Sequence, residues 1–179
     1  KGYSKQMINA NNNGMKLESE TASLVTKYLS YAVEPYRTTK TKDNVLLKNA
    51  PYRSIYGRNS RTEFLLLHGG RRIRIECKAQ HSQGSVDEKL PYLYENFKRA
   101  IPEKEAIIVI EGEGFKKGSK EWLRHKARGT KIQVFSLTQF EEYLSKGLPK
   151  KSLFTRLKEI FFHVHEYTNL QLCTFYHNT

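Results

Sequence analysis

Apolar residues recur at helical spacing near the beginning of the sequence. From about Met15 to Val33 they return every three or four positions, which predicts an amphipathic helix. Glu18 and Glu20 fall in its first turns, where the helix dipole favours acids. The Glu34-Pro35 pair predicts the end of this helix, because the residue before a proline disfavours helical backbone.

Further along, two alternating apolar runs lie on either side of Gly69-Gly70. Two glycines in this position favour a two-residue hairpin turn, because that turn needs positive φ. In the register that such a turn sets, Phe64 opposes Ile75, and the apolar face of the hairpin also takes Cys77. The pattern therefore predicts a β-hairpin over residues 62–78.

The remaining pattern alternates helices with strands. Helices are expected over residues 85–99, 117–127, 137–146 and 152–167, and strands over residues 105–111 and 131–135. Ser85 and Glu88 have capping-box spacing, so the first of these helices is predicted to begin at Ser85. Residues 36–62 are interpreted as an irregular, exposed, basic segment. The order predicts an α/β fold, a mixed sheet with a central hairpin flanked by helices, in a single domain over residues 1–179. Its core is expected at about 15–135, and a helical extension at about 137–179.

The charge of the chain narrows the choice of partner. Among 179 residues, 31 are Lys or Arg and 18 are Asp or Glu, which gives a formal net charge of +13. This excess favours a polyanion, nucleic acid before an anionic membrane surface. The longest apolar run, Ala106 to Ile110, is too short to cross a bilayer, and no secretory signal is recognised. Cys77 and Cys173 cannot build a disulfide framework, so a reducing, cytoplasmic location is expected.

The polar face of the predicted hairpin carries an unusual pair of acids. The same register places Glu63 opposite Glu76, with Cβ atoms about 4.5–5.5 Å apart, where two carboxylates repel. Lys78 lies on that face, one step beyond Glu76. A compensating Mg²⁺ fits, because this ion takes one or two carboxylates and completes its shell with water and substrate phosphate. The alternative is a solvated face, on which the acids pair with Arg61, Arg74 and Lys78.

At these residues the sequence resembles the PD-(D/E)XK nuclease superfamily. The likeness rests on Glu63 in one strand and Glu76-Cys77-Lys78 in the next, within an order of helix, hairpin, helix and strand. That order is similar to the restriction-endonuclease-like core of the family. The commoner first acid is an aspartate after a proline, whereas here Glu63 follows Thr62. Gln80 is similar to a glutamine that follows the motif lysine in some members.

The resemblance implies metal-assisted hydrolysis of phosphodiester bonds, with Mg²⁺ as cofactor and Mn²⁺ as its substitute. Glu63, Glu76 and the Cys77 carbonyl would hold the metal, and Lys78 would orient or activate the attacking water. Gln80 would make an outer contact, with an ordinary strand-end polar role as the alternative. Glu20 is similar in placement to an extra acid of some members, with a plain surface acid as the alternative. The resemblance also implies a homodimer and a bacterial or phage origin.

Two basic clusters flank the hairpin. The first mixes arginine, asparagine and tyrosine, which suits readout of DNA grooves. Its candidate DNA-binding residues are Arg37, Lys40, Lys42, Arg53, Arg58 and Arg61. The second is rich in lysine, which suits phosphate, and its candidates are Lys116, Lys117 and Lys120. Alternatives are solvated faces and, for Arg58 and Arg61, pairing with nearby acids.

Together these features predict a site-specific endonuclease that cuts double-stranded DNA, of the restriction or homing type. A structure-specific nuclease of the Holliday-junction-resolvase kind is the alternative enzyme. A non-catalytic nucleic-acid-binding module is the alternative from another class. Other chemistry is weakly signalled: His68 is interpreted as an exposed turn residue, and Cys77 as part of the core rather than a nucleophile.

Overall fold

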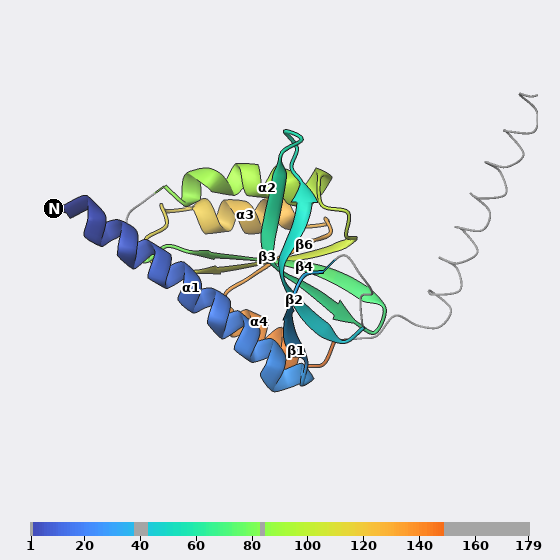
Figure 1. Cartoon of the computed structure of the whole chain (residues 1–179). Coiled ribbons are helices and arrows are strands. Elements are labelled where there is room, and N and C mark those ends of the chain that lie inside the picture. The colour runs from blue at the N-terminus through green and yellow to red at the C-terminus, as the bar shows by residue number, and fades with distance from the viewer. Residues whose placement is uncertain (1, 38–42, 83–84, 149–179) are drawn as a thin grey trace, which may run out of the picture. The chain divides into compact units, whose positions relative to one another are not determined.

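The computed structural model describes residues 2–37, 43–82 and 85–148, with side chains from residue 12 onward (Figure 1). The helices are α1 (Gly2–Leu29), the 3-10 helix η1 (Asp87–Lys89), α2 (Leu90–Arg99), α3 (Ser119–Ala127) and α4 (Leu137–Ser145). The strands are β1 (Ala32–Pro35), β2 (Val45–Arg53), β3 (Asn59–His68), β4 (Arg71–Ala79), β5 (Glu105–Glu111) and β6 (Ile132–Phe135). The helix predicted over 152–167, together with Lys40 and Lys42, lies outside the described residues.

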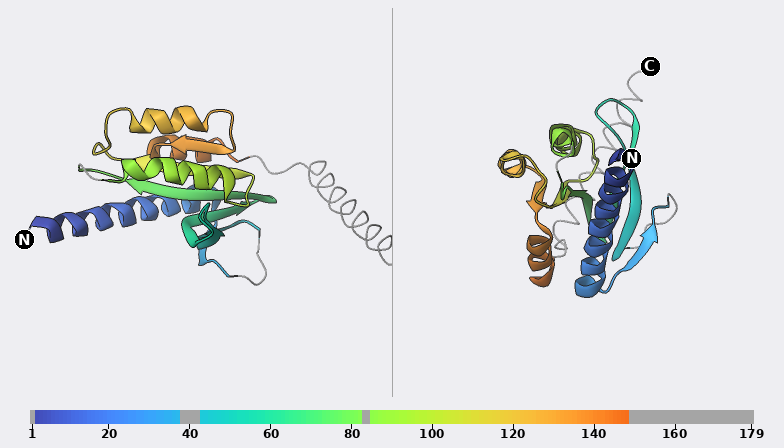
Figure 2. Two further views of the ribbon diagram at one scale, coloured as in Figure 1. Left: turned by 90° about the horizontal axis from the view of Figure 1, so that it is seen from above. Right: turned by 90° about the vertical axis from the view of Figure 1, so that its left-hand side faces the viewer.

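The six strands form one mixed sheet in the order β1 to β6. Strands β2, β3 and β4 are antiparallel neighbours, whereas β1 runs parallel to β2, and β5 and β6 run parallel to β4. Helices α1 and α4 pack on one face of the sheet, and α2 and α3 on the other (Figure 2). The predicted fold class is confirmed.

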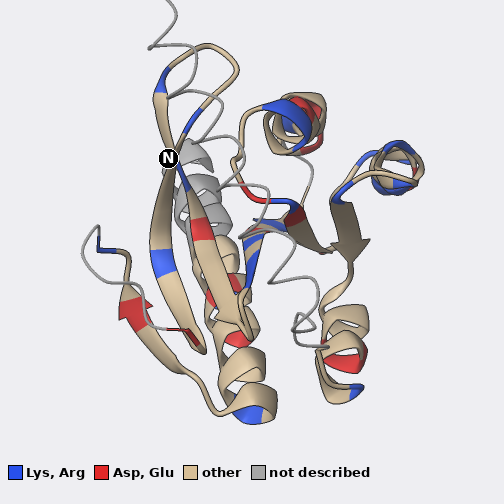
Figure 3. Ribbon diagram, turned by 90° about the vertical axis from the view of Figure 1, so that its right-hand side faces the viewer, with Lys and Arg blue, Asp and Glu red and all other residues tan. Residues whose placement is uncertain are grey.

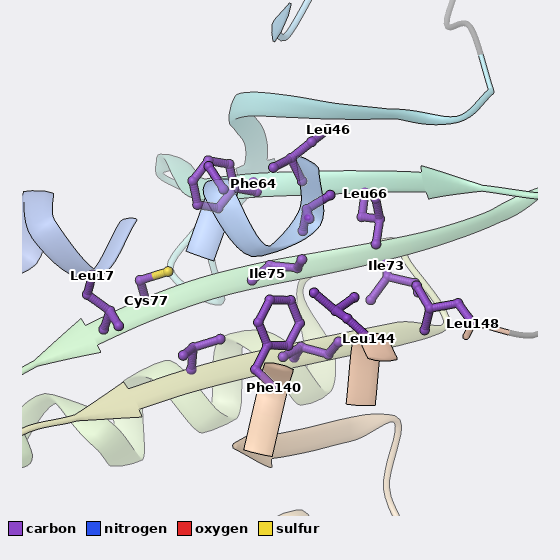
Figure 4. Close-up of a cluster of buried hydrophobic side chains, with 14 residues drawn as sticks. Leu17, Leu46, Phe64, Leu66, Ile73, Ile75, Cys77, Phe140, Leu144 and Leu148 are labelled. Carbon is purple, nitrogen blue, oxygen red and sulfur yellow. The ribbon is translucent and has the colours of Figure 1, made fainter. Parts of the chain in front are cut away.

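The central hairpin has the predicted register. Gly69 and Gly70 adopt φ values of 54° and 80° at the turn, and Phe64 pairs with Ile75. The inward side chains of β3 and β4 meet those of α1 and α4 in a buried cluster, which includes Cys77 (Figure 4). The two-residue turn thus fixes which side chains of this hairpin are buried, and the strand predicted over 105–111 forms as β5 with the same bounds.

Residues 36–62 are not an irregular basic segment, and this prediction is wrong. Residues 45–53 of that range form β2, and residues 59–62 form the beginning of β3, which pairs with β2. Leu46 and Ala50 are fully buried, because β2 covers the outer edge of the hairpin. The density of charged side chains obscured the short apolar run Val45-Leu46-Leu47.

The boundaries of two predicted helices also differ. Helix α1 begins at Gly2 and not near Met15. Helix α1 ends at Leu29, before Ser30 with a φ of 57°, and residues 32–35 become an edge strand because β2 offers them a parallel partner. Ser85 does not cap the next helix. Val86 precedes η1 without a side-chain cap, and the α-helix proper begins at Leu90, with Pro91 in its first turn, where a proline is tolerated.

Candidate active site

The site begins with a local break in the sheet at Glu63. The β3–β4 ladder ends at the Phe64–Ile75 pair, and the β2–β3 ladder passes from Phe64 to Thr62 without a pair at Glu63. Asn49, which faces this position from β2, has a φ of 57° and so departs from strand backbone. Glu63 is therefore free to turn its carboxylate toward β4, where its Oε2 atom accepts a hydrogen bond from the Cys77 backbone N–H at 3.0 Å.

Lys78 connects the two acids that the hairpin register brings together. Its Nζ atom lies 3.6 Å from Glu63 Oε1 and donates a short hydrogen bond to Glu76 Oε1. The same ammonium donates to the Cys77 carbonyl oxygen at 3.1 Å. Two carboxylates, one lysine and one backbone carbonyl thus converge at the last four residues of β4.

Burial of these charged groups shifts the pKa values of Glu76 and Lys78. Burial raises the pKa of Glu76 to about 8, with Lys78 opposing the shift and the neighbouring Glu63 adding to it. Burial also lowers the pKa of Lys78, but attraction to Glu76 and Glu63 outweighs it, so the net shift of Lys78 is upward. Without a further cation, Glu76 therefore tends to keep a proton at neutral pH while Lys78 stays charged.

The donor atoms suit a hard divalent cation. Glu76 Oε2 is buried and lacks a hydrogen-bond partner within the described structure, so one carboxylate oxygen is left for a ligand. Across the same part of the chain, no group of three or more His, Cys, Asp or Glu side chains forms a ready metal cluster. The site therefore suits an ion that binds one or two carboxylates, which here are Glu63 and Glu76. The Cys77 carbonyl, water and a phosphate group would supply the remaining oxygen ligands.

Helix α1 brings a further acid to the site, but it is Glu18 and not Glu20. Burial, and then the charge of Glu63, raises the pKa of Glu18, which places this carboxyl near the site. Glu20 instead forms an ion pair with Lys16 at 3.9 Å. Glu18 lies three residues before the fully buried Thr21, on the helix face toward β4, whereas Glu20 is rotated away from it. The sequence feature that could have identified Glu18 is its spacing of three residues from Thr21, which places both on one face of the helix.

Gln80, for which an outer contact and a strand-end role were both open, is held by protein groups on both sides of its amide. Its side-chain nitrogen donates to the Gly114 carbonyl at 2.6 Å, and its side-chain oxygen accepts from the Val86 N–H at 2.8 Å. A Cβ on Gly112 would lie 2.3 Å from the Gln80 carbonyl oxygen, so this turn tolerates only glycine at such close approach. Gln80 therefore braces the segment after β4 against the turn after β5, which supports the strand-end alternative.

The alternative of a solvated face, with the acids paired to three cations, is met for Lys78 but not for Arg61 or Arg74. Arg74 is buried and forms a bidentate pair with Glu103, with N–O distances of 2.6 and 2.8 Å. Arg61 is exposed, and no carboxylate partner is found for it among the described residues. Of the three cations considered, Lys78 is therefore the one that meets Glu63 and Glu76.

Two other residues are structural. His68 is buried and not exposed: its Nδ1 atom lies 2.7 Å from the Tyr31 hydroxyl and its Nε2 atom 2.8 Å from the Leu148 carbonyl. It thus ties the end of β3 to the segments after α1 and α4. Cys77 points into the core, where its thiol contacts the Thr21 hydroxyl at 3.5 Å and burial raises its pKa, so the prediction of a core residue is confirmed.

The predicted DNA-binding residues within the described ranges lie in two separate stretches of the chain, residues 37–61 and residues 116–120. Figure 3 colours the Lys and Arg positions along the ribbon. Exposed members of the first cluster are Arg37, Arg53, Arg58 and Arg61. In the second cluster, Lys117 is exposed and Lys120 lies 5.3 Å from the Phe115 ring centre. Lys116 is not a free cation, because it pairs with Glu88 at 2.8 Å and lies 3.9 Å from Asp87.

The comparison with known families agrees with this geometry. Residues 9–148 match a family model described as a PD-(D/E)XK nuclease superfamily domain, and the match contains the whole site. No curated protein matches the chain. Within the described ranges, no helix has the length and apolar character needed to cross a bilayer.

Proposed function

The chain belongs to the PD-(D/E)XK nuclease superfamily, and on this basis we propose that it is a Mg²⁺-dependent endonuclease that cleaves double-stranded DNA at specific sites. The observation that carries the proposal is the convergence of Glu63, Glu76 and Lys78 where β3 and β4 separate. A binding module has no use for two acids in a basic surface, since they repel phosphate. A metal-dependent hydrolase requires them.

In this proposal Glu63, Glu76 and the Cys77 carbonyl hold the metal, with Mn²⁺ able to replace Mg²⁺. When bound, the ion lowers the pKa of water and stabilises the charge that develops on the phosphoryl oxygens. The unpartnered Glu76 Oε2 is the atom that most needs such a ligand. Deprotonation of Glu76 must accompany binding, because only the carboxylate form is a good ligand.

Lys78 and Glu18 have distinct roles around the scissile phosphate. Because the pKa of Lys78 is raised, its ammonium remains charged and acts as a donor to water or to a phosphate oxygen, rather than as a base. Glu18 faces the same site from α1, and burial raises its pKa. A carboxyl of raised pKa is better suited to accept the proton of an attacking water.

The substrate follows from charge and the number of sites. A net charge of +13 suits DNA, and one Glu-Glu-Lys trio in each chain suits one strand cut. We therefore propose a homodimer that cuts both strands, of restriction or homing type. Incubation with mixed-sequence duplex DNA and Mg²⁺ tests this. Discrete fragments are expected, a smear would contradict site specificity, and intact DNA with both Mg²⁺ and Mn²⁺ would contradict catalysis.

A further inference from the structure

Strands β2 and β3 extend beyond the sheet as a two-stranded ribbon, here called the ribbon and defined as residues 50–62. The β3–β4 ladder stops at Phe64, but β2 and β3 stay paired as far as Arg53 and Asn59. Figure 1 shows the ribbon standing out from the sheet near α2. Its strand pairing begins one residue from Glu63, so it is a direct continuation of the site.

One face of the ribbon is exposed and carries three polar side chains, Arg53, Asn59 and Arg61. Arg53 pairs with Asn59 and Pro51 pairs with Arg61, and these two pairs lie two positions apart, so their side chains share a face. All four residues are exposed. Arg53 and Asn59 are within hydrogen-bonding distance, at 3.4 Å between Nη1 and Oδ1. Arginine and asparagine are the side chains that can bind guanine and adenine edges in a bidentate manner.

The base of the ribbon is held by Arg74 from the catalytic strand. Its Nη1 atom donates to the carbonyl oxygens of Ala50 at 2.9 Å and Pro51 at 3.2 Å, and to the Thr62 hydroxyl at 3.2 Å. The Tyr52 ring, on the opposite face from Arg53, lies 5.6 Å from the Arg74 guanidinium carbon. Arg74 lies two residues before Glu76, so β4 carries Glu76 and also holds the base of the ribbon.

The tip of the ribbon is also anchored. The Ile55 N–H donates to the buried Asn96 side chain of α2 at 2.9 Å, and Tyr56 stacks on Tyr92 at 5.2 Å between ring centres. A ribbon held at both ends keeps a fixed angle to the sheet. It is therefore a rigid arm and not a loop that moves independently of the active site.

We propose, building on the proposed nuclease function, that the face bearing Arg53, Asn59 and Arg61 enters the major groove of DNA and reads bases directly beside the cut. The major groove accepts a two-stranded ribbon. Arg61 and Asn59 are two and four residues from Glu63, or roughly 7 and 13 Å at about 3.3 Å per residue. DNA rises about 3.4 Å per base pair along each strand. The bases read by this face therefore lie within about six base pairs of the cleaved bond, and the enzyme does not cut at a distance from its site.

The test is selection of bound sequences from a randomised duplex library, with the ribbon variants made in a Glu76→Gln background to prevent cutting. Arg53→Ala, Asn59→Ala and Arg61→Ala are each expected to reduce preference at one or two base pairs by about 5- to 150-fold. The positions affected by Arg61→Ala and Asn59→Ala should differ. Arg99→Ala, which removes an exposed arginine paired with Glu95 on α2, is the control and should keep the full preference.

Unchanged preferences in all three ribbon variants would overturn the inference, as would an equal loss of affinity for every sequence, which indicates phosphate contacts alone. Mapping of wild-type cleavage ends then measures the distance between the cut and the preferred bases, and a separation of more than about six base pairs would also contradict the inference. The library selection does not need cleavage. If the wild type fails to cut, the proposed function fails while the binding preferences still decide the role of the ribbon.

Discussion

Glu63 accepts a hydrogen bond from the backbone N–H of Cys77 across a gap that strand pairing leaves open. In an unbroken ladder this donor would meet a backbone carbonyl of β3. Here the carboxylate of Glu63 takes the place of that carbonyl. Its negative charge therefore lies between the two strands, beside Glu76 and Lys78. The broken ladder is therefore the feature that brings the Glu63 carboxylate beside Glu76 and Lys78.

Exchange of each acid of α1 for its amide tests which one serves the site. Glu18→Gln is expected to lower the rate of DNA cleavage by about 100-fold or more, because the variant loses the carboxylate that we propose as proton acceptor for the attacking water. Glu20→Gln, two residues away, should stay within about twofold of wild type. Both are measured as single-turnover rates with Mg²⁺. Equal losses in the two variants, or a larger loss in Glu20→Gln, would return the assignment to Glu20.

The raised pKa of Glu76 makes the stability of the metal-free protein depend on pH. The folded carboxyl titrates near pH 8 against an ordinary value of 4.5, so the folded state holds the proton more tightly than the unfolded state. This contribution to stability is complete below about pH 4.5 and is lost as the pH rises through about 8. We expect the Tm of the wild type in EDTA to fall across this range more than that of Glu76→Gln.

Addition of Mg²⁺ should reverse this effect. Metal binding requires the deprotonated acid, so Mg²⁺ is expected to raise the Tm of the wild type more at pH 8.5 than at pH 6. Glu76→Gln should gain little at either pH. Thermal unfolding in EDTA measures the pH dependence of Tm without metal, and thermal unfolding in Mg²⁺ measures the gain from the ion. The same change of Tm with pH in the wild type and in Glu76→Gln would contradict a raised pKa of Glu76.

Arg74 and Glu103 form a buried ion pair, and replacing either residue alone should lower the stability of the fold. Their side chains are 2% and 1% exposed, so each variant leaves an uncompensated charge inside the protein. Arg74→Met and Glu103→Gln are each expected to reduce the free energy of unfolding by about 3–5 kcal/mol. Replacement of both residues by Met and Leu should cost less than the sum of the single changes. Urea unfolding measures this, with the surface variant Arg99→Ala, expected to cost under about 1 kcal/mol, as the control.

The hairpin could be predicted because a Gly-Gly turn fixes its register through local geometry alone. The pairing of Phe64 with Ile75, and the convergence of Glu63 with Glu76 and Lys78, both depend on that short-range constraint. The bounds of β5 could also be predicted from the sequence, since a short continuous apolar run such as Ala106 to Ile110 is typical of a buried strand.

The parts that were missed depend on contacts distant in sequence. Strand β2 forms because the edge of β3 needs a partner, and charges around Val45 concealed its apolar run. The choice between Glu18 and Glu20 requires knowing which face of α1 lies on β4. Gln80 is bound by Gly114, whose position follows only once β4 and β5 lie side by side.

The rate of DNA cleavage by Glu76→Gln with Mg²⁺ tests the central claim most directly. The glutamine keeps the size of the side chain but removes the carboxylate that we propose as a metal ligand, and with it one negative charge that would face the phosphate. We expect cleavage to fall by at least about 100-fold, with DNA affinity unchanged or tighter. Glu95→Gln, a surface acid paired with Arg99, is the matched control and should cleave at the wild-type rate. Cleavage by Glu76→Gln at the wild-type rate would contradict the assignment of this site.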